Sequence, residues 1–471
     1  MSDAPPEASP EAAPEASPEA DAWSVRFDGG TLVLDGAPPH ALPEGFTWDG
    51  RIRRARAPAI RYGGLIESRR GQPLEDRARA YEKLDIKHLG TRVARPYQEE
   101  AVAAWKAARW RGIVVLPTGA GKSYVAERVI AEARRSTLVV VPTLDLLSQW
   151  YGGLRAAFGC DIGLLGGGSH DIRPITVTTY DSAALYMERY GNRFGLLVFD
   201  EVHHLPAPMY ARAAENSIAP LRLGLTATLE RTDGSHEWLD TLVGPVCFRR
   251  EITDLAGEFL AEYYTEVIAV SLSPEEQAQY DMLRARYRAF VDSHSIRMGS
   301  PDGLRQFLML SARSKEGRAA FRAMLDSKRI AHGTERKLEL VESIIADEWG
   351  RRTLIFTNDN DTAWRISRRL LAPCITHHTD TKERRAWLDA FAAGEITVLV
   401  ASRVLNEGVD MPAAEVAIVV SGTGTVRESV QRLGRILRPG KDKQAVLYEL
   451  VTEGTIETRT SERRREHDAY R

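Results

Sequence analysis

Residues 112–123 read GIVVLPTGAGKS, an apolar run that leads directly into a glycine-rich turn and the expected start of a helix. A strand, a glycine-rich loop and a helix in this order form the frame of a phosphate-binding P-loop. The first glycine of the strict pattern is replaced by Leu116, so the match is partial on its own. A glycine turn that merely precedes a helix is the alternative, but it rarely brings Gly-Lys-Ser directly after a strand. We therefore predict a nucleotide site.

Each part of this loop has a physical task in holding a triphosphate. Its glycines let backbone N–H groups turn inward onto phosphate oxygens, at the positive end of the following helix. Lys122 would reach the β- and γ-phosphates, and the Ser123 hydroxyl would hold Mg²⁺. The loop residues that we expect to bind the nucleotide are Thr118, Gly119, Ala120, Gly121, Lys122 and Ser123.

A second motif, Asp-Glu-Val-His-His at residues 200–204, follows the apolar run 196–199. It lies at the carboxyl end of an expected strand, the edge where open α/β sheets bind ligands. Asp200 would hold Mg²⁺, and Glu201 would orient or deprotonate the attacking water. An acidic strand-to-loop junction is common in isolation but less so downstream of a P-loop. The two histidines lack further ligands at metal-site spacing, so we favour a coupling or packing role for them.

Short apolar, β-branched runs alternate with amphipathic helical stretches over most of the chain. Near-continuous apolar strands that alternate with helices indicate a parallel sheet covered on both faces. The pattern occurs twice, before residue 226 and after residue 350, so we predict two α/β domains in tandem. The expected strands are residues 112–117, 137–142, 175–180, 196–199 and 221–225, and then 353–356, 397–400, 416–420 and 445–450.

Between these domains the pattern is helical. Ser273 is a candidate N-cap, followed by Pro274 and a capping-box Glu276, so helices should run from residue 274 to 332. Residues 296–337 hold ten Lys or Arg against four acids, a local charge of +6. We expect a basic insert that contacts nucleic acid, with a solvated helical spacer as the alternative. The candidate contacts are Arg305, Arg313 and Arg318, and the expected apolar face is Leu304, Phe307, Leu308, Phe321, Met324 and Leu325.

The N-terminal part divides into a tail and a small module. Residues 1–21 repeat a Pro-Glu-Ala unit with six acids and no base, so we expect a disordered tail. In the module, Asp28-Gly29-Gly30 between two apolar runs predicts a hairpin. Five arginines within residues 51–61 fit a solvated edge strand and a nucleic-acid contact about equally well. The aromatic residues expected in its core are Trp23, Phe46, Trp48 and Tyr62.

The composition excludes several classes of protein. Of 471 residues, 43% are hydrophobic and 27% are charged, which is typical of a globular chain. No stretch has the ~18–20 apolar residues of a membrane span, and the start does not resemble a secretory signal. Three widely spaced cysteines without a CxxC pair exclude a zinc ribbon, a four-cysteine iron–sulfur cluster and a disulfide framework. We expect a cytoplasmic protein. The net charge of −2 becomes +4 without residues 1–21, a weak preference for polyanions.

A basic motif in the second α/β domain reads QRLGRILR at residues 431–438. Arg435 and Arg438 are three residues apart, so they share one face of a helix. Two such arginines, far from the P-loop in sequence, suit fingers that reach a triphosphate across an interdomain cleft. A solvated basic helix face is the alternative, and it would be preferred if the other motifs were absent.

Taken in order, the motifs resemble those of superfamily 2 helicases, and within that superfamily the XPB-like DNA helicases. The resemblance covers about residues 91–452. The features that point to XPB-like proteins are Asp-Glu-Val-His-His, the small N-terminal module, and a basic insert placed like that family's thumb. The motifs are Arg95-Pro-Tyr-Gln98, the P-loop, Pro142-Thr143, Thr178-Thr179-Tyr180, the acidic motif, Thr226-Ala227-Thr228, and residues 405–410 and 431–438.

The resemblance implies two tandem RecA-like parallel-sheet domains, a helical thumb-like insert and a mainly-β N-terminal module. The expected boundaries are 1–21 for the tail and 22–90 for a module like the family's DNA-damage-recognition domain. The ATP-binding domain would span 91–255, the insert 256–335, and the second RecA-like domain with the arginine fingers 336–471.

The resemblance also assigns roles to single residues. Gln98, with Arg95, would read the adenine of ATP, and Gln431 would lie near the γ-phosphate. Gly408 and Asp410 would also bind the nucleotide. The implied catalytic residues are Lys122, Asp200, Glu201, Gln431, Arg435 and Arg438, and the implied nucleic-acid or coupling residues include Thr143, Thr179, Thr226 and Thr228.

The implied activity is DNA-dependent ATP hydrolysis with Mg²⁺, and 3′ to 5′ movement on single-stranded or forked DNA in repair or transcription-linked processing. We expect a monomer that works with a repair protein or a nuclease and has no membrane partner. Residues 231–233 read Arg-Thr-Asp where the family has Arg-Glu-Asp, which bears on strand separation more than on hydrolysis. This departure slightly favours the alternative of an ATP-dependent DNA-binding or duplex-remodelling module. The motor subunit of a restriction or nuclease system is a third hypothesis.

Overall fold

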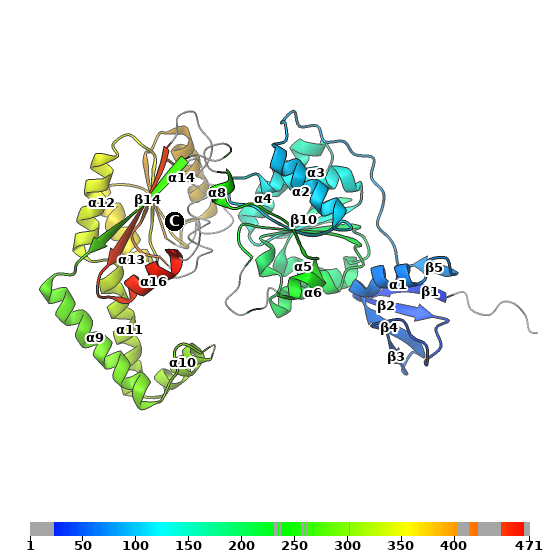
Figure 1. The fold of residues 1–471 in the computed structure, drawn as a ribbon, viewed down its shortest axis with the longest axis horizontal. Helices are drawn as coiled ribbons and strands as arrows, with labels where there is room; N and C mark the ends of the chain where they lie inside the picture. Colours follow the sequence, from blue (N-terminus) through cyan, green and yellow to red (C-terminus); the bar gives the residue numbers. More distant parts are fainter. Residues whose placement is uncertain are drawn as a thin grey trace, which may run out of the picture.

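A computed structural model of the chain describes residues 23–229, 234, 237–255, 259, 262–300, 302–402, 414–422 and 444–465. They form two α/β domains, a small β-rich module beside the first domain, and a helical projection from the second (Figure 1). The prediction of two parallel-sheet domains is therefore confirmed. None of the helices in the described ranges has the length and apolar character that a bilayer crossing requires.

The N-terminal module is a five-stranded sheet in the order β3-β4-β2-β1-β5. The predicted hairpin is confirmed, because β1 and β2 pair antiparallel around Gly29 and Gly30, both at positive φ. Phe46 and Tyr62 are in the core, whereas Trp48 is exposed. The elements are β1 (Trp23–Asp28), β2 (Thr31–Asp35), β3 (Thr47–Asp49), β4 (Arg54–Pro58), a 3₁₀ turn (Ala59–Arg61), α1 (Tyr62–Ser68) and β5 (Leu74–Arg77).

The arginine-rich strand of this module is not at the sheet edge. β4 lies between β3 and β2, so the alternative of an edge strand is wrong, and the alternative of a nucleic-acid contact stays a prediction. Arg54 pairs with Asp35 on β2, and Arg56 pairs with Asp28 at 2.9 Å. β4 is paired with β2 and β3, and two of its arginines meet acids of the same sheet, Asp35 on β2 and Asp28 at the end of β1.

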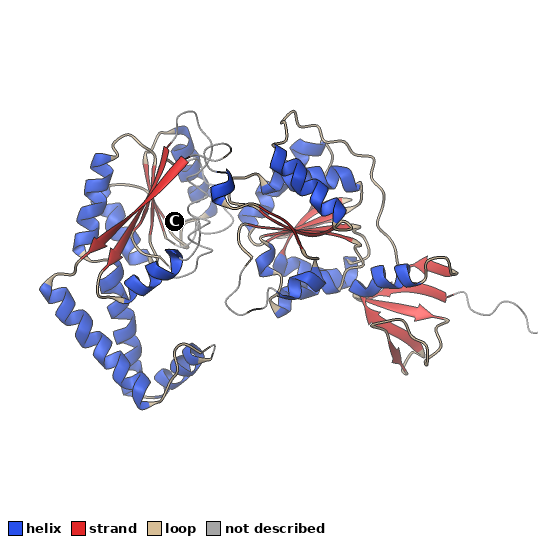
Figure 2. Ribbon diagram, viewed as in Figure 1, coloured by secondary structure: helices blue, strands red, loops and turns tan. Residues whose placement is uncertain are grey.

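The first α/β domain has an eight-stranded sheet in the order β13-β6-β12-β11-β7-β10-β8-β9, and it is parallel apart from β8–β9. Every residue of β7, β10 and β11 is buried, because helices cover both faces of the sheet (Figure 2). The strands are β6 (Arg111–Val115), β7 (Thr137–Val141), β8 (Gly163–Gly166), β9 (Ser169–Asp171), β10 (Ile175–Thr179), β11 (Leu196–Asp200), β12 (Leu221–Thr226) and β13 (Val246–Arg249). The helices are α2 (Pro96–Ala107), α3 (Lys122–Ala133), α4 (Leu144–Phe158), α5 (Tyr180–Tyr190), α6 (Pro208–Glu215), α7 (Trp238–Leu242) and α8 (Ile252–Leu255), with a 3₁₀ turn at Val202–His204.

The second α/β domain has a six-stranded parallel sheet in the order β14-β19-β18-β15-β17-β16. We expected residues 256–335 to form the insert, but β14 pairs along its whole length with β19 and so belongs to the second sheet. The strands are β14 (Glu262–Val270), β15 (Thr353–Phe356), β16 (Cys374–Ile375), β17 (Val398–Ala401), β18 (Val416–Val419) and β19 (Gln444–Thr452). The helices are α12 (Glu335–Asp347), α13 (Asn360–Leu370), α14 (Thr381–Ala393) and α16 (Ile456–Arg465).

The insert lies between β14 and α12 and consists of α9 (Pro274–Ser293), α10 (Gly303–Arg313) and α11 (Lys315–His332). The predicted start of α9 is confirmed, because Ser273 and Glu276 form a reciprocal capping box. Phe307 and Met324 face the core of the insert, but Leu304, Leu308 and Leu325 are exposed. The prediction of one shared apolar face is therefore wrong for these three leucines, because the helices enclose only a small core.

One of the basic residues counted for the insert is not at the surface. Lys337 on α12 is fully buried, and its Nζ donates to Glu457 Oε2 at 2.5 Å and to the Val420 carbonyl at 2.6 Å. A buried ammonium needs such partners to offset its lost hydration. Lys337 therefore ties α12 to α16, and the charge that the insert offers to solvent is smaller than its formal +6.

The N-terminal module is attached to the first α/β domain by polar and packing contacts. Asn192 exchanges hydrogen bonds with the backbone after β5, at 3.0 Å to the Ala78 carbonyl and 3.1 Å from the Ala80 N–H. Ile218 of the first domain packs into the core of the module. A cavity of about 410 Å³ lies at this junction, lined from both sides by residues that include Arg61 and Arg111.

Candidate nucleotide and nucleic-acid site

The P-loop joins β6 to α3 in a conformation that requires its glycines. Gly119 and Gly121 have φ of +86° and +82°, where a side chain would be strained. A Cβ on Gly121 would also lie 2.6 Å from Nε2 of Gln98. Lys122 begins α3, and its Nζ donates to the Leu116 carbonyl at 3.3 Å, across the loop. Among the described residues, the buried Thr118 hydroxyl has no hydrogen-bond partner.

Residues 95–98, Arg-Pro-Tyr-Gln, which we call the base motif, contact this loop from the start of α2. Gln98 is 1% exposed; its amide donates to the Ala120 carbonyl at 2.9 Å and accepts from the Arg95 N–H at 3.0 Å. The Tyr97 hydroxyl donates to the same carbonyl at 2.8 Å. Three residues at the N-terminus of α2 therefore fix the position of the loop that follows β6.

The acidic pair lies where β11 ends. Asp200 is 6% exposed, and its carboxylate accepts from the Trp150 indole N–H at 2.8 Å and from the Glu201 N–H at 3.1 Å. Burial and the neighbouring charge of Glu201 raise the pKa of Asp200 to about 6, although the Trp150 bond and the charge of Lys122 oppose the shift. Glu201 adopts a left-handed conformation with φ of +47°, which is uncommon for a residue with a side chain. Strain of this kind often occurs at functional sites.

His203 connects the acidic pair to the Thr-Ala-Thr motif on the neighbouring strand. Its Nδ1 lies 3.0 Å from the Thr226 hydroxyl and 3.5 Å from the Glu201 carboxylate. The Thr226 hydroxyl also donates to the Thr228 carbonyl at 2.6 Å. This geometry suits the predicted coupling role of the histidine. We call Gln98, residues 118–123, Asp200, Glu201, His203 and Thr226 the nucleotide face.

Thr143 and Thr179 lie at the same edge of the first sheet, after β7 and β10. Their side chains are N-caps: the Thr143 hydroxyl accepts from the Leu146 N–H at 3.3 Å, and the Thr179 hydroxyl from the Ser182 N–H at 3.2 Å. Each hydroxyl thus caps the N-terminus of a helix, where the helix carries a partial positive charge. A helix N-terminus of this kind can meet a backbone phosphate.

The oxygen donors at the nucleotide face fit Mg²⁺ in their chemistry. Ser123 offers a hydroxyl next to Lys122, and Asp200 offers a buried carboxylate. Mg²⁺ prefers oxygen ligands and is commonly held by one or two carboxylates together with substrate phosphates. A divalent cation at this place would also relieve the repulsion between Asp200 and Glu201.

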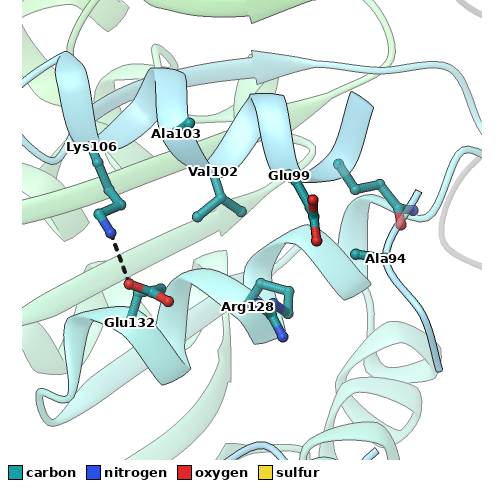
Figure 3. Close-up of a pocket in the computed structure, with 8 residues that line it drawn as sticks. Ala94, Glu99, Val102, Ala103, Lys106, Arg128 and Glu132 are labelled. Atoms are coloured by element: carbon teal, nitrogen blue, oxygen red, sulfur yellow. Dashed lines mark hydrogen bonds and ion pairs between the residues drawn. The ribbon is translucent and has the colours of Figure 1, made fainter. Parts of the chain in front are cut away.

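A separate cavity of about 190 Å³ lies between α2 and α3. Lys106 and Glu132 form an ion pair of 2.9 Å in its wall, and Glu99 and Arg128 project from the two helices (Figure 3). Gln98 also lines this cavity, whereas Lys122 and Asp200 do not. This cavity therefore lacks the P-loop lysine and the buried acid that we expect to hold a triphosphate and its metal.

The two α/β domains contact each other through an ion pair. Arg384 on α14 donates to the Asp145 carboxylate in the first turn of α4 at 2.9 Å, and both side chains are mostly buried. Arg384 also donates to the Thr379 carbonyl at 3.4 Å. Asp145 follows Thr143 by two residues, so the contact lies beside the edge of the first sheet that carries the capping threonines.

The three candidate arginines of the insert lie at its surface. Arg305 pairs with Asp302 at 3.2 Å, and its side chain is 83% exposed. Arg313 is exposed in the last turn of α10. Arg318 is exposed on α11, and it donates to the Ala312 carbonyl at 3.1 Å, near the C-terminus of α10. Arg318 therefore also has a structural contact.

Several predicted site residues lie outside the described residues. They are Gly408, Asp410, Gln431, Arg435 and Arg438, together with the Arg-Thr-Asp departure at residues 231–233. Their assignments stay predictions. Sequence reasoning missed Trp150, because a tryptophan on the apolar side of an amphipathic helix looks like a core residue. Its position on α4, one helix after the P-loop helix, gives no signal that its indole N–H would meet Asp200.

Three family models match consecutive parts of the chain. Residues 25–78 match the xeroderma pigmentosum group B helicase damage recognition domain, residues 92–231 the res subunit of type III restriction enzymes, and residues 336–440 the helicase conserved C-terminal domain. In fold, the chain is similar to the crystal structure of the Pyrococcus furiosus Hef helicase domain, with a TM-score of 0.50 at 20% identity, over 78% of this chain and 97% of that one.

Two relatives show which family of helicases this chain resembles in sequence. The DNA 3'-5' translocase XPB2 of Sulfurisphaera tokodaii is 41% identical over 443 residues, which cover 94% of this chain and 99% of the relative. The DNA 3'-5' helicase XPB of Kineococcus radiotolerans is 35% identical over 378 residues, 77% of this chain and 60% of that relative.

Two parallel-sheet domains with a P-loop and an acidic pair at the strand ends define an ATP-hydrolysing enzyme of helicase superfamily 2. The full-length match at 41% identity and the damage-recognition module then settle the family. The chain belongs to the XPB family of helicases and translocases.

Proposed function

We propose that this chain is an ATP-driven DNA translocase that acts as a 3′ to 5′ helicase. The observation that carries the proposal is the nucleotide face, where hydrogen bonds join the base motif to the P-loop, and Trp150 and His203 hold the acidic pair beside the Thr-Ala-Thr motif. The names of the relatives support the substrate and the polarity. The damage-recognition module supports a role in DNA repair or transcription-linked processing. We propose a monomer that works with a repair partner.

The residues of the nucleotide face divide the hydrolytic task. Lys122 would leave the Leu116 carbonyl and hold the β- and γ-phosphates. Ser123 and Asp200 would hold Mg²⁺, which supplies charge neutralisation on the phosphate oxygens when it is bound. Glu201 would orient the attacking water and take its proton. Arg95 and Gln98 would read the adenine.

The second α/β domain would complete the site. We assign Arg435 and Arg438 as arginine fingers that meet the transferred phosphoryl group, with Gln431 near the γ-phosphate and Gly408 and Asp410 beside the nucleotide. Domain closure around ATP would bring them to the nucleotide face. His203, Thr226 and Thr228 would then transmit the state of the acidic pair to bound DNA.

DNA would cross the sheet edge that carries the N-termini of α4 and α5. Thr143 and Thr179 cap these helices, so backbone N–H groups and helix dipoles face a phosphate backbone there. Arg305, Arg313 and Arg318 of the insert would add phosphate contacts. Such contacts position the nucleic acid and carry little sequence information.

The decisive experiment measures ATP hydrolysis without nucleic acid and with single-stranded DNA, duplex DNA, forked DNA and RNA. We expect DNA to stimulate turnover, and we expect ATP-dependent strand displacement from a 3′-tailed duplex but not from a 5′-tailed one. Glu201→Gln is the matched control, because it keeps the shape of the site but removes the base; turnover should fall by about 10²–10⁴-fold. No hydrolysis by the parent chain, or full hydrolysis by Glu201→Gln, would refute the assignment.

A second function is favoured by the Arg-Thr-Asp departure at residues 231–233. A chain that lacks the central acid of the family's Arg-Glu-Asp could remodel or grip a duplex without processive unwinding. The displacement assay separates the two functions: DNA-stimulated hydrolysis without displacement on either tail would support remodelling. Restoring the acid with Thr232→Glu should then introduce displacement.

A further inference from the structure

Phe259, between the first α/β domain and the second, contacts the base motif. α8 carries the buried Ile252 and Leu255, which belong to an apolar cluster with residues of both α/β domains. Phe259 follows, and its N–H donates to the Leu255 carbonyl at 2.9 Å. β14, the edge strand of the second sheet, begins at Glu262. Only residues 260 and 261 therefore separate Phe259 from the second domain.

Phe259 contacts the residues that we assign to adenine recognition. The Arg95 guanidinium donates to the Phe259 carbonyl at 3.1 Å and lies 5.8 Å from the centre of the Phe259 ring. The Tyr97 ring packs edge-on against the same ring at 5.1 Å. The Phe259 side chain is partly buried against this same apolar cluster.

These contacts continue to the phosphate-binding loop. Arg95 also donates to the Tyr97 hydroxyl at 3.0 Å, and that hydroxyl donates to the Ala120 carbonyl at 2.8 Å. The chain of contacts thus runs from Phe259 through Arg95 and Tyr97 to Ala120. One nitrogen of Arg95 serves both Phe259 and Tyr97, so Arg95 links the two residues, while Gln98 holds the Ala120 carbonyl independently of Phe259.

We propose that Phe259 is a positioning residue that couples occupation of the base site to the placement of the second domain. The proposal rests on the proposed function, because it requires ATP at the nucleotide face. The Phe259 carbonyl and ring orient the Arg95 guanidinium, so a base that engages Arg95 binds more tightly when Phe259 is in place. β14 starts three residues after Phe259 and is the first strand of the second sheet along the chain. A shift of Phe259 would therefore move this strand. Coupling of this kind is reciprocal, so the placement of the second domain also changes nucleotide affinity.

A purely structural role for Phe259 makes different predictions. A packing residue would lower thermal stability and change the binding of every ligand alike. A positioning residue changes the binding of ligands that carry the base, and it leaves triphosphate binding without a base unaltered. The ring can be tested by itself, because the Phe259 carbonyl is present in every variant.

The experiment compares Phe259→Leu, which removes the ring but keeps apolar volume, with Phe259→Tyr, which keeps the ring. Aromatic and cation–π contacts of this kind contribute about 0.5–1.5 kcal/mol, so KM for ATP should rise roughly 2–10-fold in Phe259→Leu with kcat at saturation little changed. Inhibition by inorganic tripolyphosphate should stay at the parent's level. Phe259→Tyr should behave like the parent.

The coupling is measured as the ratio of single-stranded DNA affinity with and without a non-hydrolysable ATP analogue. At a saturating concentration of the analogue, this ratio of affinities should be closer to one in Phe259→Leu than in the parent chain. Phe248→Leu is the matched control, because Phe248 is also partly buried in the first domain and lies 5.0 Å from a guanidinium, that of Arg250. It should leave both KM and the ratio unchanged.

The outcomes separate this inference from the proposed function. A parent chain without DNA-stimulated hydrolysis would refute the function. A working parent, with a folded Phe259→Leu variant that keeps the parent's KM and affinity ratio, would overturn the inference alone. An equal loss of ATP and tripolyphosphate binding would mean that Phe259 only packs. If thermal melting shows that Phe259→Leu is unfolded, Phe259→Met provides the same test with less loss of volume.

Discussion

The nucleotide face and the helical insert use polar side chains in opposite ways. On the nucleotide face, Gln98, Asp200 and Thr226 are buried, and each has hydrogen-bond partners at 2.6–3.0 Å. On the insert, Arg305, Arg313 and Arg318 are exposed. A buried group with fixed partners cannot be replaced without leaving a neighbour unsatisfied. An exposed charge is screened by salt, so one such charge contributes little to DNA affinity. The effect depends mainly on how many such charges there are.

This difference predicts how each region responds to substitution. A single change on the nucleotide face should have a large effect on the chemical step. A single change on the insert should have a small effect on affinity, and several changes together should alter the salt dependence. If the two regions respond alike in the following experiments, the difference that we describe between them is wrong.

The largest effect is expected for Lys122→Ala. The substitution removes the charge that we place on the β- and γ-phosphates, so nucleotide binding should weaken and turnover should fall to background. Fold should be retained, because Lys122 donates only one described hydrogen bond, to the Leu116 carbonyl. Turnover and binding of a fluorescent nucleotide are the two measurements. Measurable DNA-stimulated hydrolysis in the folded variant would contradict the P-loop assignment.

The next effect concerns the second domain. Arg435→Ala or Arg438→Ala should cost on the order of 10³-fold or more in turnover with a modest loss of ATP affinity, because a finger meets charge that develops in the transition state. Steady-state kinetics with a parallel nucleotide-binding titration separate the two quantities. Near-normal turnover in both single variants would mean that this helix face is solvated and that the nucleotide face works without fingers.

The elements that a sequence encodes locally were predictable. The P-loop, the acidic pair and the start of α9 each depend on neighbours within a few residues, so spacing and residue type suffice. The place of β14 in the second sheet was not predictable, because it depends on pairing with β19, far along the chain. Lys337 and Trp150 were missed for a similar reason: their partners Glu457 and Asp200 are brought to them only by the tertiary fold.

The limits of pattern reasoning are clearest in the insert. The spacing of its leucines predicted one apolar face, yet Leu304, Leu308 and Leu325 are exposed. Helical periodicity shows which residues share a face, but it does not show how far a neighbouring helix extends over that face. The same holds for charge, since a formal count includes Lys337 although it is buried in an ion pair.

The smallest effect is expected for the insert, where Arg305, Arg313 and Arg318 are replaced together by Gln. Each phosphate that is no longer neutralised should flatten the salt dependence of DNA affinity by about 0.7 on a single strand or 0.9 on duplex. For three contacts, the slope should therefore be flatter by up to about 2.1 on a single strand or about 2.7 on duplex. The loss should be similar for different sequences, because backbone contacts carry no base information. Basal ATP hydrolysis should survive, while its stimulation by DNA should fall.

The matched control replaces Arg77, Arg173 and Arg385 by Gln, which makes the same change in net charge. Each of these arginines is exposed and pairs with a nearby acid: Glu75, Asp171 and Asp389, respectively. None belongs to the insert, so the salt slope should stay at the parent's value. Because Arg318 also bonds to the Ala312 carbonyl, thermal melting must first show that the insert triple variant is folded. If the folded insert variant keeps both the parent's slope and its DNA-stimulated rate, the insert is a solvated spacer. DNA would then be held by the capped helix N-termini and by groups outside the insert.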